Sequence, residues 1–148
     1  VKSIEADSLR SLLFSIQYLL YWVIGYSAFA FLLTLIREII KDCEDIEGDK
    51  AFECKTLPIV HGIPAAKKVA SYLIAFLLIL ITFLEFMQAN SGDWIPFGYF
   101  LILISLPLIW VMIKLRKAKE KKHFFVISQV IKVLMLIGIL YTGLIYLF

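Results

Sequence analysis

Four long apolar stretches, separated by polar segments, dominate the sequence. Residues 11–36, 69–84 and 94–113 contain no charged side chain, and residues 123–148 carry only Lys132. A helix rises about 1.5 Å per residue, so about 20 residues cross a hydrocarbon core of about 30 Å. The pattern predicts four membrane-spanning helices, at about 12–36, 69–88, 95–114 and 124–147.

The composition agrees with a membrane protein. Of the 148 residues, 61% are hydrophobic and 18% are charged, and the mean hydropathy is +0.89. A chain this small cannot hide so much apolar surface from water in a soluble fold. We therefore expect an all-α integral membrane protein, with residues 1–148 forming a single membrane domain.

Basic residues predict how the chain is oriented. The connections 37–68 and 114–122 each hold six lysines or arginines, whereas the short turn at 89–93 holds none. Short loops rich in lysine and arginine stay on the cytoplasmic side, so both basic connections are expected there. The second cluster lies between two spanning helices, which argues against nucleic-acid binding. Glu85, near the far end of its helix, is expected to reach the opposite interface.

Seven of the twelve acidic residues lie between Arg37 and Lys55. Nothing before Gly48 breaks a helix, so the first spanning helix is expected to continue into this segment. At about 100° per residue, Asp42, Asp45 and Asp49 then fall within about 60° of one another on one face. Such carboxylates repel one another, and a divalent cation would relieve that repulsion.

Mg²⁺ suits this pattern, because it takes one or two carboxylates and completes its shell with waters and substrate phosphate oxygens. The implied ligand is a diphosphate at the membrane surface, with an apolar tail between the helices. A solvated, mixed-charge helix end is the plainer interpretation. An EF-hand fits poorly, since a loop starting at Asp42 places Ile46 at its fifth position. Cys43 and Cys54 lack the histidine pair of a zinc site.

The run Lys55-Thr56-Leu57-Pro58 follows the acids. Pro58 is expected to end local helix and leave an extended or turned backbone, with the next helix starting near Ala65. The spacing Asp-x-x-Asp-x-x-x-Asp, followed by Lys-Thr-Leu-Pro, resembles the second aspartate-rich motif of the UbiA superfamily of intramembrane prenyltransferases. The surrounding residues are most similar to the digeranylgeranylglyceryl phosphate synthase branch.

The resemblance implies a nine-helix bundle with two aspartate-rich loops on the cytoplasmic side. These loops bind Mg²⁺ and a polyprenyl diphosphate, and the prenyl group passes to a lipid or aromatic acceptor. In this branch a geranylgeranyl group passes to a glycerol-phosphate ether lipid. It implies metal ligands at Asp42, Asp45 and Asp49, with Asp45 and Asp49 also catalytic, and diphosphate contacts at Arg37, Lys41, Lys50 and Lys55.

The chain also departs from the family pattern. It contains no first motif of the form Asn-Asp-x-x-Asp-x-x-x-Asp, and Glu53 stands where the family usually has glycine. The four helices would correspond to the last four of nine, which makes the chain the C-terminal half of a longer enzyme and its N-terminal half an expected partner. The alternatives are a non-catalytic four-helix membrane subunit and a fragment of a cation channel or transporter.

Overall fold

The computed structural model describes residues 2–92 and 94–147, and these are helical almost throughout. The chain forms two compact units, Val1–Phe31 and Leu32–Phe148. The first unit is one stretch of helix over residues 2–31, which continues into the second unit. The second unit contains every other helix and the acidic segment, and the contacts described below lie within it.

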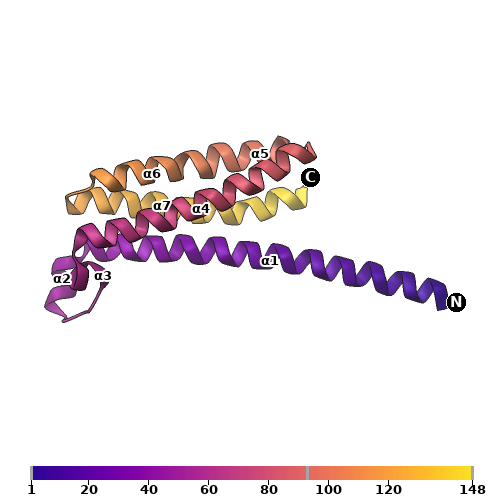
Figure 1. Cartoon of the computed structure of the whole chain (residues 1–148), viewed down its shortest axis with the longest axis horizontal. Coiled ribbons are helices and arrows are strands. Elements are labelled where there is room, and N and C mark those ends of the chain that lie inside the picture. Colours follow the sequence, from indigo (N-terminus) through magenta and orange to yellow (C-terminus); the bar gives the residue numbers. More distant parts are fainter. Residues whose placement is uncertain (1, 93, 148) are drawn as a thin grey trace. The chain divides into compact units, whose positions relative to one another are not determined.

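The helices follow one another with short connections (Figure 1). No strand occurs in residues 2–92 or 94–147. The helices are α1 (Lys2–Glu44), α2 (Ile46–Ala51), α3 (Leu57–His61), α4 (Ile63–Ser91), α5 (Trp94–Phe100), the π-helix η1 (Leu101–Ser105), α6 (Leu106–Lys117) and α7 (Lys121–Leu147).

Four helical stretches of the described chain are long and apolar enough to cross a membrane. They are Leu12–Glu44, Ile63–Met87, Trp94–Lys117 and Lys121–Tyr141. The third combines α5, η1 and α6. Its π-helical turn ends two residues before Pro107, whose ring would clash with the carbonyl of Leu103 in a regular α-helix. The prediction of an all-α fold with four spanning helices is confirmed.

Two local predictions about the segment between the first two spans are wrong. The helix breaks at Asp45, where φ is −101° and ψ is 22°, rather than at Gly48. Pro58 lies in the first turn of α3 instead of ending a helix, because a first-turn residue needs no backbone N–H. The next helix begins at Ile63, directly after Gly62, whose φ of 84° is accessible to glycine.

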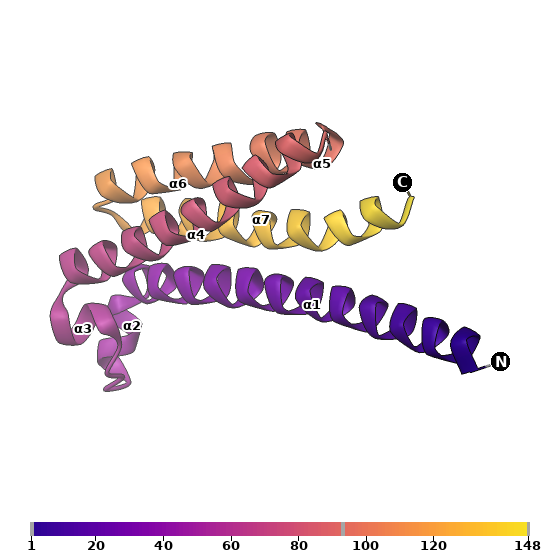
Figure 2. The same ribbon diagram turned by 45° about the vertical axis from the view of Figure 1, so that its right-hand side comes forward.

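The core of the second unit is built from one apolar stripe on each long helix. In Figures 1 and 2, α4 lies beside α6, and α6 lies beside α7. The buried side chains recur every three or four residues, as expected for helices that pack along one face. They include Leu33, Ile36, Ile40 and Cys43 on α1, Ala66, Ala70, Ile74, Leu77 and Ile81 on α4, Leu108, Val111 and Leu115 on α6, and Phe124, Ile127, Ile131 and Leu134 on α7.

Glu85 does not reach an interface, which corrects the sequence-based expectation. Its side chain is only 6% exposed, and Ser105, at the end of the π-helix, donates a hydrogen bond of 2.6 Å to its Oε1 atom. A carboxyl group inside a helix bundle needs such a partner, because apolar surroundings offer no other hydrogen bonds. Hydrophobic patterning could not show that α4 turns Glu85 inward.

Lys67 joins the beginning of α4 to the end of α6. Its Nζ atom donates to the carbonyl oxygens of Arg116, at 2.9 Å, and Ala118, at 2.8 Å. The last carbonyl groups of a helix lack partners within the helix, and they carry the negative end of its dipole. A single ammonium group therefore satisfies the end of α6 and holds it against α4.

Glu53 has an unusual backbone conformation. Its φ of 55° lies in the left-handed region, and it is the one non-glycine residue with positive φ in the described chain. Glycine adopts this conformation without strain, whereas a Cβ atom adds about 1–2 kcal/mol. The glycine that the family resemblance leads one to expect here would suit this backbone.

We predict that Lys67→Met lowers the free energy of unfolding by about 1–3 kcal/mol, because two carbonyl groups lose a charged donor. The measurement is thermal or denaturant unfolding of the detergent-solubilised protein. Lys68→Met is the matched control, since Lys68 is exposed on the same turn. An equal loss in both variants would contradict the role of Lys67.

We predict that Glu53→Gly raises the free energy of unfolding by about 0.5–1 kcal/mol, which is the relieved strain minus the extra chain entropy of glycine. Glu53→Ala removes the same charge but keeps the Cβ atom, so it should give no comparable gain. Unfolding of the two variants, measured side by side, separates backbone strain from charge. A gain in the alanine variant as large as in the glycine variant would argue against strain.

Candidate functional site

The acidic segment, residues 37–55, lies at one end of the second unit, where α1 ends and α2 and α3 follow (Figure 1). The start of α4 and the connection between α6 and α7 lie at this same end in both views. The two predicted basic connections therefore share one end of the unit. The hydrogen bonds from Lys67 to the end of α6 support that placement.

The three predicted metal ligands lie on either side of the bend at Asp45. Backbone hydrogen bonds cross the bend, from the N–H of Asp45 to the carbonyl of Lys41 at 2.9 Å and from the N–H of Asp49 to the carbonyl of Asp45 at 3.0 Å. The helical register thus continues from α1 into α2 although the helix is interrupted. Asp42, Asp45 and Asp49 are all partly buried.

Like charges converge on Asp42. Burial raises the pKa of its carboxyl group above the ordinary value, the negative charges of Asp49, Glu38 and Asp45 raise it further, and Lys41 lowers it. Among these three acids Asp49, beyond the bend, has the largest influence on the pKa of Asp42. Partly buried carboxylates this close together favour a bound cation, because a cation removes their mutual repulsion.

Asp45 has a partner that the sequence did not suggest. Lys121, at the start of α7, places its Nζ atom 3.3 Å from the Asp45 Oδ1 atom. The two residues are 76 positions apart, so no local pattern could have paired them. This salt bridge joins the second basic connection to the acidic segment.

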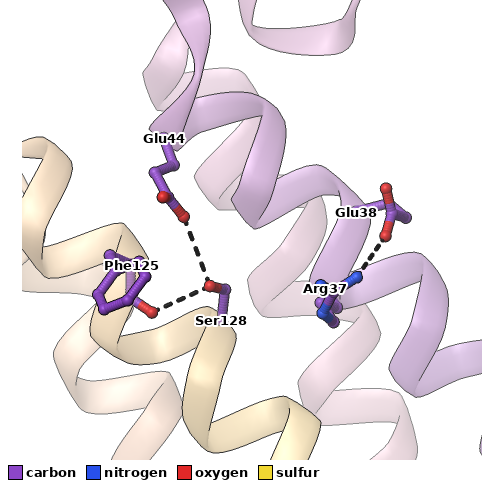
Figure 3. Close-up of polar contacts among 5 residues, drawn as sticks. All are labelled: Arg37, Glu38, Glu44, Phe125 and Ser128. Atoms are coloured by element: carbon purple, nitrogen blue, oxygen red, sulfur yellow. Dashed lines mark hydrogen bonds and ion pairs between the residues drawn. The ribbon is translucent and has the colours of Figure 1, made fainter.

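The four cations predicted to contact a diphosphate differ in their surroundings. Arg37 is bound by its neighbour Glu38, with 2.7 Å between the Arg37 Nη1 and Glu38 Oε1 atoms (Figure 3). Lys41, Lys50 and Lys55 are exposed. The structure therefore leaves three of these side chains accessible, and it engages the fourth in an ion pair on the surface of α1.

Glu44 lies on a different side of α1 and takes part in packing. Its Oε2 atom lies 3.4 Å from the hydroxyl of Ser128 on α7, and that hydroxyl lies 2.9 Å from the carbonyl oxygen of Phe125 (Figure 3). Ser128 is buried. Sequence analysis did not single out Ser128, because a serine within an apolar helix carries no pattern of its own.

The residues present fit Mg²⁺ by the chemistry of their donor atoms, which are carboxylate oxygens. Within residues 2–92 and 94–147, no three histidine, cysteine or acidic side chains form a group that could hold a metal ion by themselves. Mg²⁺ does not require such a group, since it is commonly held by one or two carboxylates together with substrate phosphates. The arrangement suits a metal–diphosphate complex better than a metal site made entirely of protein.

Thr56 adds a polar group that lacks a partner in the described structure. Its Oγ1 atom is buried, and no hydrogen bond to it is found among the described residues. Buried hydroxyl groups are nearly always satisfied, so an unsatisfied one is a candidate for ligand binding. Thr56 follows Cys54, whose backbone N–H donates to the carbonyl of Asp49 at 2.9 Å. That hydrogen bond turns the chain back toward Asp49 two residues before Thr56, so the hydroxyl follows closely after the acids.

We predict that the Asp45–Lys121 salt bridge contributes only about 0.2–1 kcal/mol, because the side chains of Lys121 and Asp45 remain 66% and 44% exposed to solvent. A double-mutant cycle with Asp45→Asn and Lys121→Gln, measured by unfolding in detergent, gives this coupling energy. The coupling should shrink at high salt. A coupling energy above about 2 kcal/mol that salt does not change would instead show that the pair behaves as a buried ion pair.

Comparison with known proteins places this chain in one family. The family model described as UbiA prenyltransferase family matches residues 11–146. A digeranylgeranylglyceryl phosphate synthase from Methanosphaera stadtmanae is 38% identical over 121 residues, covering 79% of this chain and 41% of that protein. No solved structure matches the chain.

Other relatives carry the same name. The synthase from Methanopyrus kandleri is 33% identical over 111 residues, covering 75% of this chain and 39% of the relative. The synthase from Pyrococcus furiosus is 49% identical over 61 residues, covering 40% of this chain and 22% of the relative. The chain therefore spans about two fifths, or less, of the length of these relatives. With four candidate spans and a match over nearly its whole length, this chain is a multi-pass membrane protein that belongs to the UbiA prenyltransferase family.

Proposed function

We propose that the acidic segment binds the diphosphate of a polyprenyl donor through Mg²⁺, as part of a prenyltransferase. One observation carries the proposal: three partly buried aspartates lie close together in sequence where the first candidate span of a UbiA-family chain ends. The activity is that of the whole protein, since the chain spans only part of the length of its relatives.

In this proposal Asp42, Asp45 and Asp49 hold Mg²⁺, and Asp45 and Asp49 act in catalysis. Bound Mg²⁺ would supply Lewis-acid stabilisation of the negative charge that develops on the leaving diphosphate. The exposed side chains of Lys41, Lys50 and Lys55 add positive charge around the same group. Arg37 can join them by exchanging Glu38 for a phosphate oxygen, since both form strong charge-assisted hydrogen bonds with a guanidinium group.

The substrates proposed are geranylgeranyl diphosphate as donor and a glycerol-phosphate ether lipid as acceptor. The printed names of the relatives support this choice, because digeranylgeranylglyceryl phosphate is the product that such a transfer would make. The acidic segment would face the cytoplasm. The lysines and arginines of residues 37–68 and 114–122 support that side, and the two connections share one end of the unit.

We predict that Asp42→Asn, Asp45→Asn and Asp49→Asn each lower the rate of prenyl transfer by about 100-fold or more. The assay follows labelled geranylgeranyl diphosphate into lipid, using the full-length protein in proteoliposomes with Mg²⁺ or a chelator. Glu47→Gln is the matched control, because Glu47 is an exposed acid of the same segment. It should keep most of the activity.

Two results would contradict the proposal. Full activity in the Asp45 and Asp49 variants would show that these residues are not the metal ligands. Binding of geranylgeranyl diphosphate that is equally tight with chelator present, and without turnover in the full-length protein, would favour a non-catalytic membrane subunit.

A further inference from the structure

A pocket of about 290 Å³ opens between the end of α6 and the beginning of α7. It is lined by residues outside the acidic segment, and none of them has a role in the proposed transfer. Its walls include Trp110, Lys114, Lys117, His123, Val126 and Ile127. The pocket lies within the second unit, close to the short connection between the two helices.

The pocket wall is mostly apolar, and three of the residues that line it, Lys114, Lys117 and His123, carry nitrogen-bearing side chains. Trp110, Val126 and Ile127 provide the apolar surface. The Nζ atom of Lys114 lies 5.4 Å from the centre of the Trp110 ring, a distance at which the ring attracts a cation. Lys117, the last residue of α6, adds a second ammonium group. A ligand that fits must therefore present a negative charge beside an apolar part.

His123 adds a hydrogen-bond donor of defined direction. Its Nδ1 atom accepts from the backbone N–H groups of Lys119 and Glu120, at 3.4 Å each. A neutral imidazole that accepts at Nδ1 carries its proton on Nε2. The Nε2–H group is therefore the donor that His123 can offer to an anionic ligand, and the connection between α6 and α7 holds the ring in place.

The surrounding charge is strongly positive. Residues 114–122 contain six cations and one acid, Glu120. In the described part of the chain, Lys121 is the one cation of this group that forms a salt bridge. Lys114 and Lys117 are exposed, so their charge is available to a ligand.

The position of the pocket indicates that its ligand is a lipid. It lies at the shared end of two candidate membrane spans, Trp94–Lys117 and Lys121–Tyr141. Ile109, Ile113 and Val126 are exposed beside it and can contact hydrocarbon chains. Basic pockets between spanning helices characteristically bind anionic lipid headgroups. A volume of about 290 Å³ suits a headgroup rather than a whole lipid.

We propose that this pocket binds the phosphate headgroup of an anionic glycerophospholipid of the surrounding membrane. Lys114, Lys117 and His123 contact the phosphate, and the apolar chains lie along the exposed faces of α6 and α7. The site is separate from the acidic segment, and the proposal does not depend on the transferase activity.

The test measures lipid binding to the full-length protein in neutral detergent by native mass spectrometry, with phosphatidylglycerol as probe and phosphatidylcholine as competitor. Phosphatidylglycerol should bind in preference to phosphatidylcholine. An exposed ammonium group in direct contact with the phosphate contributes up to about fivefold in affinity, so Lys114→Gln with Lys117→Gln should weaken phosphatidylglycerol binding by up to about 25-fold. Val126→Trp should also weaken it, because the larger side chain fills the pocket without changing the charge.

Lys119→Gln is the matched control, since it removes one charge from the same connection but does not line the pocket. It should change the affinity by less than about twofold, and the unfolding temperatures of all variants should match that of the unmodified protein. A loss with Lys119→Gln equal to that of either pocket lysine, or no loss with Val126→Trp, would overturn the proposal. Displacement of the lipid by equimolar glycerol 3-phosphate would also overturn it, because the site would then recognise a free phosphate ester.

Discussion

The contact between Lys67 and the last carbonyl groups of α6 holds together the end of the molecule where its charged groups meet. Its ammonium group bonds to the carbonyl oxygens of Arg116 and Ala118, so the start of α4 is fixed against the end of α6. The acidic segment leads into α4, and the basic connection follows α6. Both charged segments are therefore placed by helix ends, and the exposed salt bridge between Asp45 and Lys121 only joins segments that are already close.

The fold was largely predictable, because long charge-free runs can be satisfied in a membrane only by helices. The acidic segment was visible in the sequence, and burial together with the charges of neighbouring acids, Asp49 foremost, raises the pKa of Asp42 there. The break at Asp45 was not predictable, because it occurs where the chain leaves the first spanning helix and pairs with Lys121, 76 residues away. Pro58 was misjudged because proline at the start of a helix and proline after its end share the same local sequence signs.

Opposite charges are separated along the chain but gathered at one end of the second unit. Acidic groups cluster around the end of α1 and on α2, whereas lysines and arginines cluster where α6 gives way to α7. The first cluster carries negative charge, and the second carries positive charge beside an apolar pocket wall. One end of the second unit thus offers two chemically distinct surfaces, and the family motif accounts for only the acidic one.

The hydrogen bond between Glu85 and Ser105 bears on how the chain is assembled during synthesis. Glu85 is made twenty residues before the hydroxyl that satisfies it, so α4 emerges from the ribosome with an unmatched carboxyl group in its apolar stretch. Releasing that helix alone into lipid is costly. The pair therefore favours release of α4 and the following span from the translocon together, as a hairpin.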